Sequence, residues 1–217
     1  MALRVLLASY LVLGSIALAA SNGGYTYDAK GFYGGASGGG GHFDEAPQLQ
    51  GCFNGGPGRI FRGGQPLVSL NSAGTALTDA AVGTLKRNGV TLVINLRVEA
   101  SALRRDEQAV LARAGIRMMH FPMTTSWPNS SHSYPQGWID QGAAAVQAIH
   151  DALLRGENVF IHCLHGEDRT GIFIAMLRRW EGAECPQSKR EFRVYGGTLY
   201  EPLQVAYDQI LKKHFGR

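Results

Sequence analysis

Short apolar runs rich in β-branched residues recur from residue 59 onward, and longer segments of mixed apolar and polar residues separate them. The runs are typical of buried strands, and the longer segments repeat their apolar residues at helical spacing. The predicted strands are 60–62, 90–96, 116–121 and 158–162. The predicted helices are 78–88, 101–114, 138–154, 169–180, 187–194 and 201–214. This alternation predicts an α/β fold: one compact domain with a largely parallel sheet flanked by helices.

Capping residues set the expected helix limits. Gly89, Gly115 and Gly156 directly follow three of the predicted helices, as glycine does where a helix ends. Thr78 is the expected N-cap of the first helix.

The first 20 residues have the layout of a secretory signal peptide. Arg4 gives a positive start, an apolar run follows from Val5 to Ala17, and Ala17-Leu18-Ala19 matches a cleavage pattern. We therefore expect residues 1–20 to be removed and the protein to be exported, to the periplasm or the extracellular space. The apolar run is short for a bilayer span, and no other segment is apolar enough, so no stable membrane span is expected after cleavage.

Residues 21–58 form a glycine-rich arm, and the domain is expected at 59–217. The run from Gly31 to Gly41 cannot hold a regular element, since glycine loses too much backbone entropy on ordering. A flexible leader is the favoured interpretation, and docking of the arm's aromatic residues on the domain is the alternative. Those aromatic residues are Tyr25, Tyr27, Phe32, Tyr33 and Phe43.

Composition narrows the class of partner. Hydrophobic residues make up 45% and charged residues 18%, which excludes global disorder. The net charge of +4 falls to +3 once Arg4 is removed, and the basic residues are scattered. This mild positive charge suits an anionic substrate, but it is not typical of a nucleic-acid-binding surface.

Three cysteines remain in the exported chain: Cys52, Cys163 and Cys185. Thiols tend to pair in an oxidising compartment, and one of three must stay unpaired. The chemistry below makes Cys163 the free one. Whether Cys52 and Cys185 form a disulfide is open, because sequence does not give their separation.

The segment after the last predicted strand carries the candidate chemistry. Cys163 sits at the strand's carboxyl end, and Arg169 opens the next helix. The intervening turn can aim backbone N–H groups inward, and the helix N-terminus adds partial positive charge. Arg169 supplies a planar fork of donors for two phosphate oxygens. The residues expected to bind the substrate are Leu164, His165, Gly166, Glu167 and Arg169.

The same positive field favours a thiolate at Cys163, the form that acts as a nucleophile. Attack on phosphorus would give a phosphocysteine, which water then hydrolyses. Thr170 can donate its hydroxyl to the sulfur, and His162 is expected to orient the loop through hydrogen bonds. No metal ion and no cofactor is needed for this reaction.

The pattern His162-Cys163-x5-Arg169-Thr170-Gly171 resembles the signature loop of the protein-tyrosine-phosphatase superfamily. Two further segments resemble its compact dual-specificity-like members: Ile60-Phe61-Arg62-Gly63-Gly64-Gln65-Pro66, and Val93-Ile94-Asn95-Leu96-Arg97 with Glu99. The likeness spans residues 59–182. It implies that superfamily's fold, the cysteinyl-phosphate mechanism and roles for Cys163, Arg169 and Thr170.

The expected general acid is missing from its usual place. Trp127-Pro128-Asn129 lies 34 residues before Cys163 and resembles the superfamily's acid loop, but asparagine has no proton to give. The loop from Thr124 to Gln136 contains no carboxylate. Asp168 is the first candidate, since bacterial lipid- and tyrosine-phosphatase relatives carry an aspartate in that slot, and a structural pairing of Asp168 is nearly as well supported. His132 is the second candidate.

Substrate and competing classes stay open at this level. A secreted member resembles the phytase-like branch, which favours inositol polyphosphates, with phosphotyrosine or dual-specificity peptides as the close alternative. Arg97, Arg104 and Arg105 are candidates for a cationic rim, although a solvated helix face is the favoured explanation of them. A phosphate-binding protein without turnover, a rhodanese-like sulfurtransferase and a half metal site at His162-Cys163-x-His165 are the other interpretations. Sequence does not set the oligomeric state.

Overall fold

The computed structural model describes residues 21–22, 25–26, 32, 43–45, 57–66, 75–98, 101–123, 136–180 and 209–210. The predictions for the signal peptide, for Cys52 and Cys185, and for the helix at 187–194 lie outside these residues. Of the last predicted helix, 201–214, residues 209–210 are described and are helical.

A five-stranded sheet forms the centre of the fold, in the order β3-β4-β7-β5-β6. The four strands from β4 to β6 in this order are parallel, and β3 runs antiparallel to β4 at one edge. The strands are β3 (Asp44–Glu45), β4 (Ile60–Gly63), β5 (Val90–Asn95), β6 (Arg117–His120) and β7 (Asn158–His162). A separate two-stranded pair joins β1 (Ser21–Asn22) to β2 (Tyr25–Thr26). The four predicted strands and the parallel arrangement are confirmed.

Four helices connect and cover the parallel strands: α1 (Thr75–Arg87), α2 (Ser101–Arg113), α3 (Gln136–Leu154) and α4 (Asp168–Trp180). The predicted ends are close to the observed ones, and Gly89, Gly115 and Gly156 have positive φ, as expected of glycines that follow helices. The predicted start of α1 is wrong. The helix begins at Thr75, so Thr78 lies inside it and is not its N-cap, because the preceding Thr75-Ala76-Leu77 also takes helical geometry.

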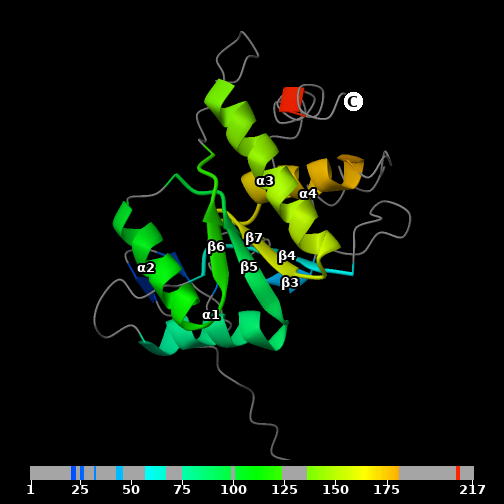
Figure 1. The fold of residues 1–217 in the computed structure, drawn as a ribbon. Coiled ribbons are helices and arrows are strands. Elements are labelled where there is room, and N and C mark those ends of the chain that lie inside the picture. Colours follow the sequence, from blue (N-terminus) through cyan, green and yellow to red (C-terminus); the bar gives the residue numbers. More distant parts are fainter. Residues whose placement is uncertain are drawn as a thin grey trace, which may run out of the picture.

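The helices cover the two faces of the sheet in pairs (Figure 1). On one face, α3 and α4 pack on β5 and β7 around Ile94, Ile149, Ile161 and Phe173. On the other face, α1 and α2 bury Leu85 and Leu111 with the alternate residues of the same strands. Burial on both faces explains why the strands read as continuous apolar runs.

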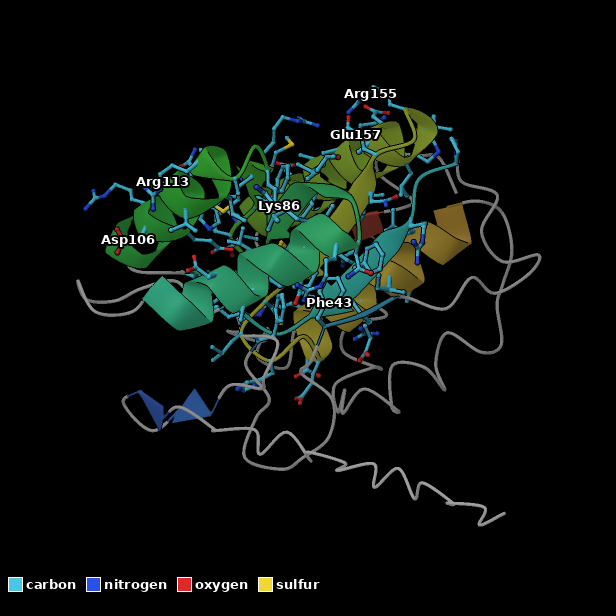
Figure 2. All side chains as sticks on the ribbon, turned by 90° about the horizontal axis from the view of Figure 1, so that it is seen from below. Phe43, Lys86, Asp106, Arg113, Arg155 and Glu157 are labelled. Atoms are coloured by element: carbon cyan, nitrogen blue, oxygen red, sulfur yellow. The ribbon has the colours of Figure 1, made fainter. Side chains whose placement is uncertain are left out.

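The second core cluster also takes in two residues of the glycine-rich arm. Phe32 is fully buried. Phe43, which Figure 2 labels, stacks on Phe61 with 5.1 Å between ring centroids. The rings of Phe32 and Phe43 also contact Phe160 of β7. For Phe32 and Phe43 the flexible-leader prediction is therefore wrong and the docking alternative holds. Large aromatic side chains gain more from burial than the local ordering of the backbone costs.

Within the part of the chain that the structure describes, no helix combines the length and apolarity needed to cross a membrane.

Candidate active site

The carboxyl ends of β4, β5 and β7 meet at one edge of the sheet, where ligands gather in open α/β folds. The segment that leaves β7, residues 163–169, turns back into the first residues of α4. We call it the cysteine loop. Its position between the strand end and a helix N-terminus is the one predicted from the sequence.

Cys163 lies buried at the start of the cysteine loop. The backbone N–H of Gly166 donates to its Sγ at 3.3 Å. Burial raises the pKa of the Cys163 thiol, but the positive charge of Arg169 and hydrogen bonds from Thr170 and Gly166 together outweigh it, so the pKa falls below its ordinary value of 9.0. The loop therefore favours the thiolate, as predicted.

Arg169 and Thr170 stand in the first turn of α4. Besides its charge effect on the sulfur, Arg169 donates from Nη1 to the carbonyl oxygen of Met123 at 3.3 Å, which ties the arginine to the segment that follows β6. The Thr170 hydroxyl is fully buried and lowers the pKa of Cys163, although among the described residues it forms no well-aligned hydrogen bond. The backbone of Thr170 lowers the pKa of Cys163 as well, and donation from its hydroxyl to the sulfur stays a prediction.

Gly166 is the point where the cysteine loop touches β4. Its φ is +79°, and a Cβ built there would lie 2.4 Å from the carbonyl carbon and oxygen of Gly63. Its own carbonyl oxygen accepts a 2.7 Å hydrogen bond from Nη2 of the buried Arg62. Only glycine meets both the dihedral and the space requirement here, since L side chains rarely adopt this φ.

The residues that follow β4 and β5 make further contacts with the cysteine loop and with each other. The N–H of Gln65 donates to the carbonyl of Leu164 at 3.0 Å. The Gln65 side chain accepts a hydrogen bond from Nη1 of Arg97, which follows β5. Arg97 is half-buried, and its charge reaches His165 in the cysteine loop, so it lies at the rim of the site. Arg105, by contrast, is exposed on α2, and the side chain of Arg104 lies outside the described set.

His162, at the end of β7, makes contacts with both of its ring nitrogens. Nδ1 lies 3.1 Å from the carbonyl oxygen of Cys163, and Nε2 lies 2.9 Å from Oε1 of Glu107 on α2. The other carboxylate oxygen of Glu107 accepts a 2.8 Å hydrogen bond from Nδ2 of Asn95. These side chains are all buried. His162 thus contacts the first residue of the cysteine loop, and its role in orienting the loop stays a prediction.

The acidic and basic side chains of the loop itself are partly exposed. Burial lowers the pKa of His165, as do the charges of Arg169 and Arg97, with Asp168 opposing them. Burial and the charge of Asp168 raise the pKa of Glu167, with Arg62 opposing. Nδ1 of His165 lies 4.0 Å from Oε2 of Glu167. Asp168 is the first residue of α4, one position from Arg169, which places its carboxyl group in the same loop as the sulfur.

The predicted acid loop, with Asn129 and the alternative acid His132, lies outside the described residues. Two supporting groups were not predicted. The sequence places Arg62 only in the segment that resembles compact phosphatases, although its position just before Gly63-Gly64, at a strand end, is a signal of a loop-facing charge. For Glu107 the sequence predicts only a helical position, and nothing in its spacing links it to His162.

Comparisons with known proteins agree with this geometry. Residues 57–192, more than half of the chain, match the model of a family described as the tyrosine phosphatase family. No curated protein matches the sequence.

Solved structures of low sequence identity share the fold. A DUF442 protein from Shewanella putrefaciens CN-32, described as a candidate phosphatase, has a TM-score of 0.54 at 17% identity, over 81% of this chain and 92% of its own. Kinase associated phosphatase, with its catalytic-site cysteine changed to serine, has a TM-score of 0.54 at 14% identity, over 73% and 89%. Tk-PTP in its active form has a TM-score of 0.52 at 16% identity, over 74% and 93%.

The family match covers β7, the cysteine loop and α4, which together hold the buried thiol of Cys163 and lower its pKa. The sulfurtransferase interpretation and that of a binding protein without turnover have no such support. The chain belongs to the tyrosine phosphatase family and is a cysteine-based phosphatase.

Proposed function

We propose that the protein hydrolyses phosphomonoesters with Cys163 as its nucleophile. The thiolate attacks phosphorus in line, a sulfur–phosphorus bond forms, and the bond from phosphorus to the ester oxygen breaks. The inward-facing amides of the loop and the guanidinium of Arg169 hold the equatorial oxygens. Because these donors are fixed before the reaction, they stabilise the charge of the transition state.

Asp168 is the proposed general acid. In the first step its carboxyl group gives a proton to the departing ester oxygen. In the second step the resulting carboxylate takes a proton from the water that attacks phosphocysteine, which releases inorganic phosphate and restores the thiolate. The position of Asp168 beside Arg169 at the start of α4 supports this assignment.

The observation that carries the proposal is the lowered pKa of a buried thiol that accepts a hydrogen bond from the Gly166 N–H at 3.3 Å. A buried cysteine without such donors has a raised pKa and is inert. The direct test is to quench the enzyme with acid during turnover of p-nitrophenyl phosphate and to search for phosphate on Cys163 by mass spectrometry. Phosphate on Cys163, absent in Cys163→Ser, supports the proposal. Turnover that survives in Cys163→Ser rejects it.

For the substrate, we favour inositol polyphosphates. Arg97 supports this choice, because its hydrogen bond to Gln65 holds a cation at the rim, beyond the groups that grip the reacting phosphate. A second phosphate on the substrate would meet Arg97.

Phosphotyrosine peptides are the second candidate, favoured by the description of the matched family. A panel of inositol phosphates, phosphoinositides and phosphopeptides with phosphate-release detection separates the two. In the same panel Arg97→Gln should lower kcat/KM for inositol polyphosphates more than for p-nitrophenyl phosphate. Arg105→Gln, exposed on α2, is the matched control and should change neither. Equal loss on both substrates in Arg97→Gln would remove its role in selectivity.

Export stays a prediction from the first 20 residues. N-terminal sequencing of the protein secreted by its native host would locate the new N-terminus after Ala19 or close to it, and a retained Met1 would reject cleavage.

A further inference from the structure

The buried group that the proposed reaction leaves unused is Glu107. It projects from α2, and it is almost completely enclosed. A carboxylate costs several kcal/mol to bury unless its oxygens are satisfied. Both of its oxygens point at residues that lead into the active-site edge: Oε1 at His162 and Oε2 at Asn95.

The contacts of His162 determine where its protons lie. The carbonyl oxygen of Cys163 can only accept, so Nδ1, 3.1 Å away, must carry a proton and donate it. Nε2 and Oε1 of Glu107 are 2.9 Å apart, and two bare lone pairs would repel at that distance. A second proton therefore lies between them. With that proton on Nε2 the two groups form an ion pair with positive charge on the imidazole; with it on Oε1 both groups are neutral.

The two side chains are oriented with respect to the sulfur. His162 precedes Cys163 directly, whereas Glu107 approaches the far side of the ring. In the ion-pair form, the positive end thus faces the cysteine loop. The ring is also held by Phe160, which stacks against it with 5.5 Å between centroids.

Asn95 extends the same network to β5. Its Nδ2 donates to Glu107, and its Oδ1 accepts a 2.8 Å hydrogen bond from the N–H of Arg97. The carbonyl of His162 accepts a 2.9 Å hydrogen bond from the N–H of Leu96. Glu107 therefore contacts the last residues of both β5 and β7, two of the strands whose ends form the site.

We propose that Glu107 is a positioning residue for the phosphatase reaction, which acts through His162 to hold a donated proton on the Cys163 carbonyl and a positive charge beside the sulfur. The inference rests on the proposed role of Cys163. Other charged or titratable groups also face this region, so their contribution must stay constant in any test. They are Arg62 from β4, Arg97 after β5, His120 from β6, His165 and Glu167 in the loop, and Asp168 and Arg169 from α4.

Two substitutions separate charge from geometry. In Glu107→Gln, the amide oxygen can accept from Asn95 while the amide nitrogen donates to Nε2, so a neutral His162 keeps its proton on Nδ1. This variant loses the carboxylate charge and retains the hydrogen bond with Asn95 and the contact with Nε2. In Glu107→Met both are lost in a side chain of similar length. Glu157→Gln is the control: Glu157 pairs with Arg155 and Arg117 at the surface, just before the opposite end of β7 (Figure 2).

The first readout is the pH midpoint of inactivation by iodoacetate, which reports the pKa of the Cys163 thiol. The second is the vanadate concentration that protects this thiol from alkylation. If Glu107 had only a structural role, its substitution would lower thermal stability but leave the pH midpoint and the protective vanadate concentration of the folded protein unchanged. We expect the midpoint to rise measurably in Glu107→Gln and further in Glu107→Met, by about one pH unit, which corresponds to about tenfold less thiolate at a fixed lower pH. Vanadate protection should weaken in the same order, and Glu157→Gln should match the wild type.

Wild-type midpoint and vanadate protection in a folded Glu107→Met variant would overturn the inference. If Glu107→Met does not fold, Glu107→Gln decides alone: an unchanged midpoint overturns the inference and a raised one supports it. If vanadate fails to protect the wild type itself, the proposed role of Cys163 falls instead. The two failures are thus distinguishable.

Discussion

Replacement of Gly166 by alanine tests the link between β4 and the cysteine loop most sharply. The new Cβ would lie 2.4 Å from the carbonyl carbon and oxygen of Gly63 and 2.8 Å from the nitrogen of Gly64. These are backbone atoms of a segment paired with β7, where Gly63 stands opposite His162, so they cannot rotate away. The loop must therefore move, or β4 must.

The expected cost has two parts. An L side chain at this positive φ costs about 1–2 kcal/mol, and an extra methyl group in a closely packed site costs about 1–3 kcal/mol. The free energy of unfolding should thus fall by about 2–5 kcal/mol, which is a large share of an ordinary domain's stability. Gly115→Ala isolates the first part, because Gly115 has a similar φ of +76° but no atom within 4 Å of its Cβ.

The function should suffer as well. Movement of residue 166 withdraws its N–H from Sγ and its carbonyl from Arg62. Loss of one fixed donor to an anion lowers kcat by about 10²-fold or more in comparable sites. The assay combines urea unfolding with kcat on p-nitrophenyl phosphate for both alanine variants. If Gly166→Ala costs no more stability than Gly115→Ala and keeps wild-type kcat, the reasoning about the contact with β4 is wrong.

Three further predictions follow from the same geometry. Asp168→Asn should lower kcat at least tenfold on alkyl phosphates and much less on p-nitrophenyl phosphate, whose leaving group needs no proton; equal loss on both would remove the acid role. Because the folded state lowers the pKa of Cys163 below 9.0, its thiolate adds stability that is fully present above the unfolded pKa and is lost as pH falls through the folded pKa. The difference in unfolding free energy between the wild type and Cys163→Ser should therefore shrink toward acid pH, and a difference independent of pH would contradict the lowered pKa. Phe43→Ala should cost about 3–5 kcal/mol in urea unfolding, since Phe43 packs on both Phe61 and Phe160, and a cost below 1 kcal/mol would show that the arm does not dock.

Local signals explain what the sequence could predict. The strand 158–162, the cysteine at its end and the arginine that follows are consecutive, so their joint position needs no long-range information. Glycines at 89, 115 and 156 mark helix ends through their own backbone preference. The start of α1 differs from the prediction because Thr78 has the side chain of an N-cap residue, and nothing local shows that Thr75-Ala76-Leu77 is also helical.

Long-range packing explains what the sequence could not predict. Phe32 and Phe43 stand among glycines that favour disorder, and only their contacts with Phe61 and Phe160 override that preference. Glu107 and His162 are far apart in sequence and meet because α2 packs behind the sheet. The spacing of these two residues in the sequence does not predict that they are in contact. The sequence therefore predicted the groups proposed to touch the substrate better than the groups that hold them.

The most direct test of the central claim is selective alkylation of the sulfur. Iodoacetate is applied across a range of pH with and without vanadate, and the labelled cysteine is identified by mass spectrometry. If a buried thiol is kept ionised by the cysteine loop, Cys163 takes the label with a midpoint below 9.0, and vanadate blocks it. Labelling of Cys163 only near pH 9, with no protection by vanadate, would contradict the account.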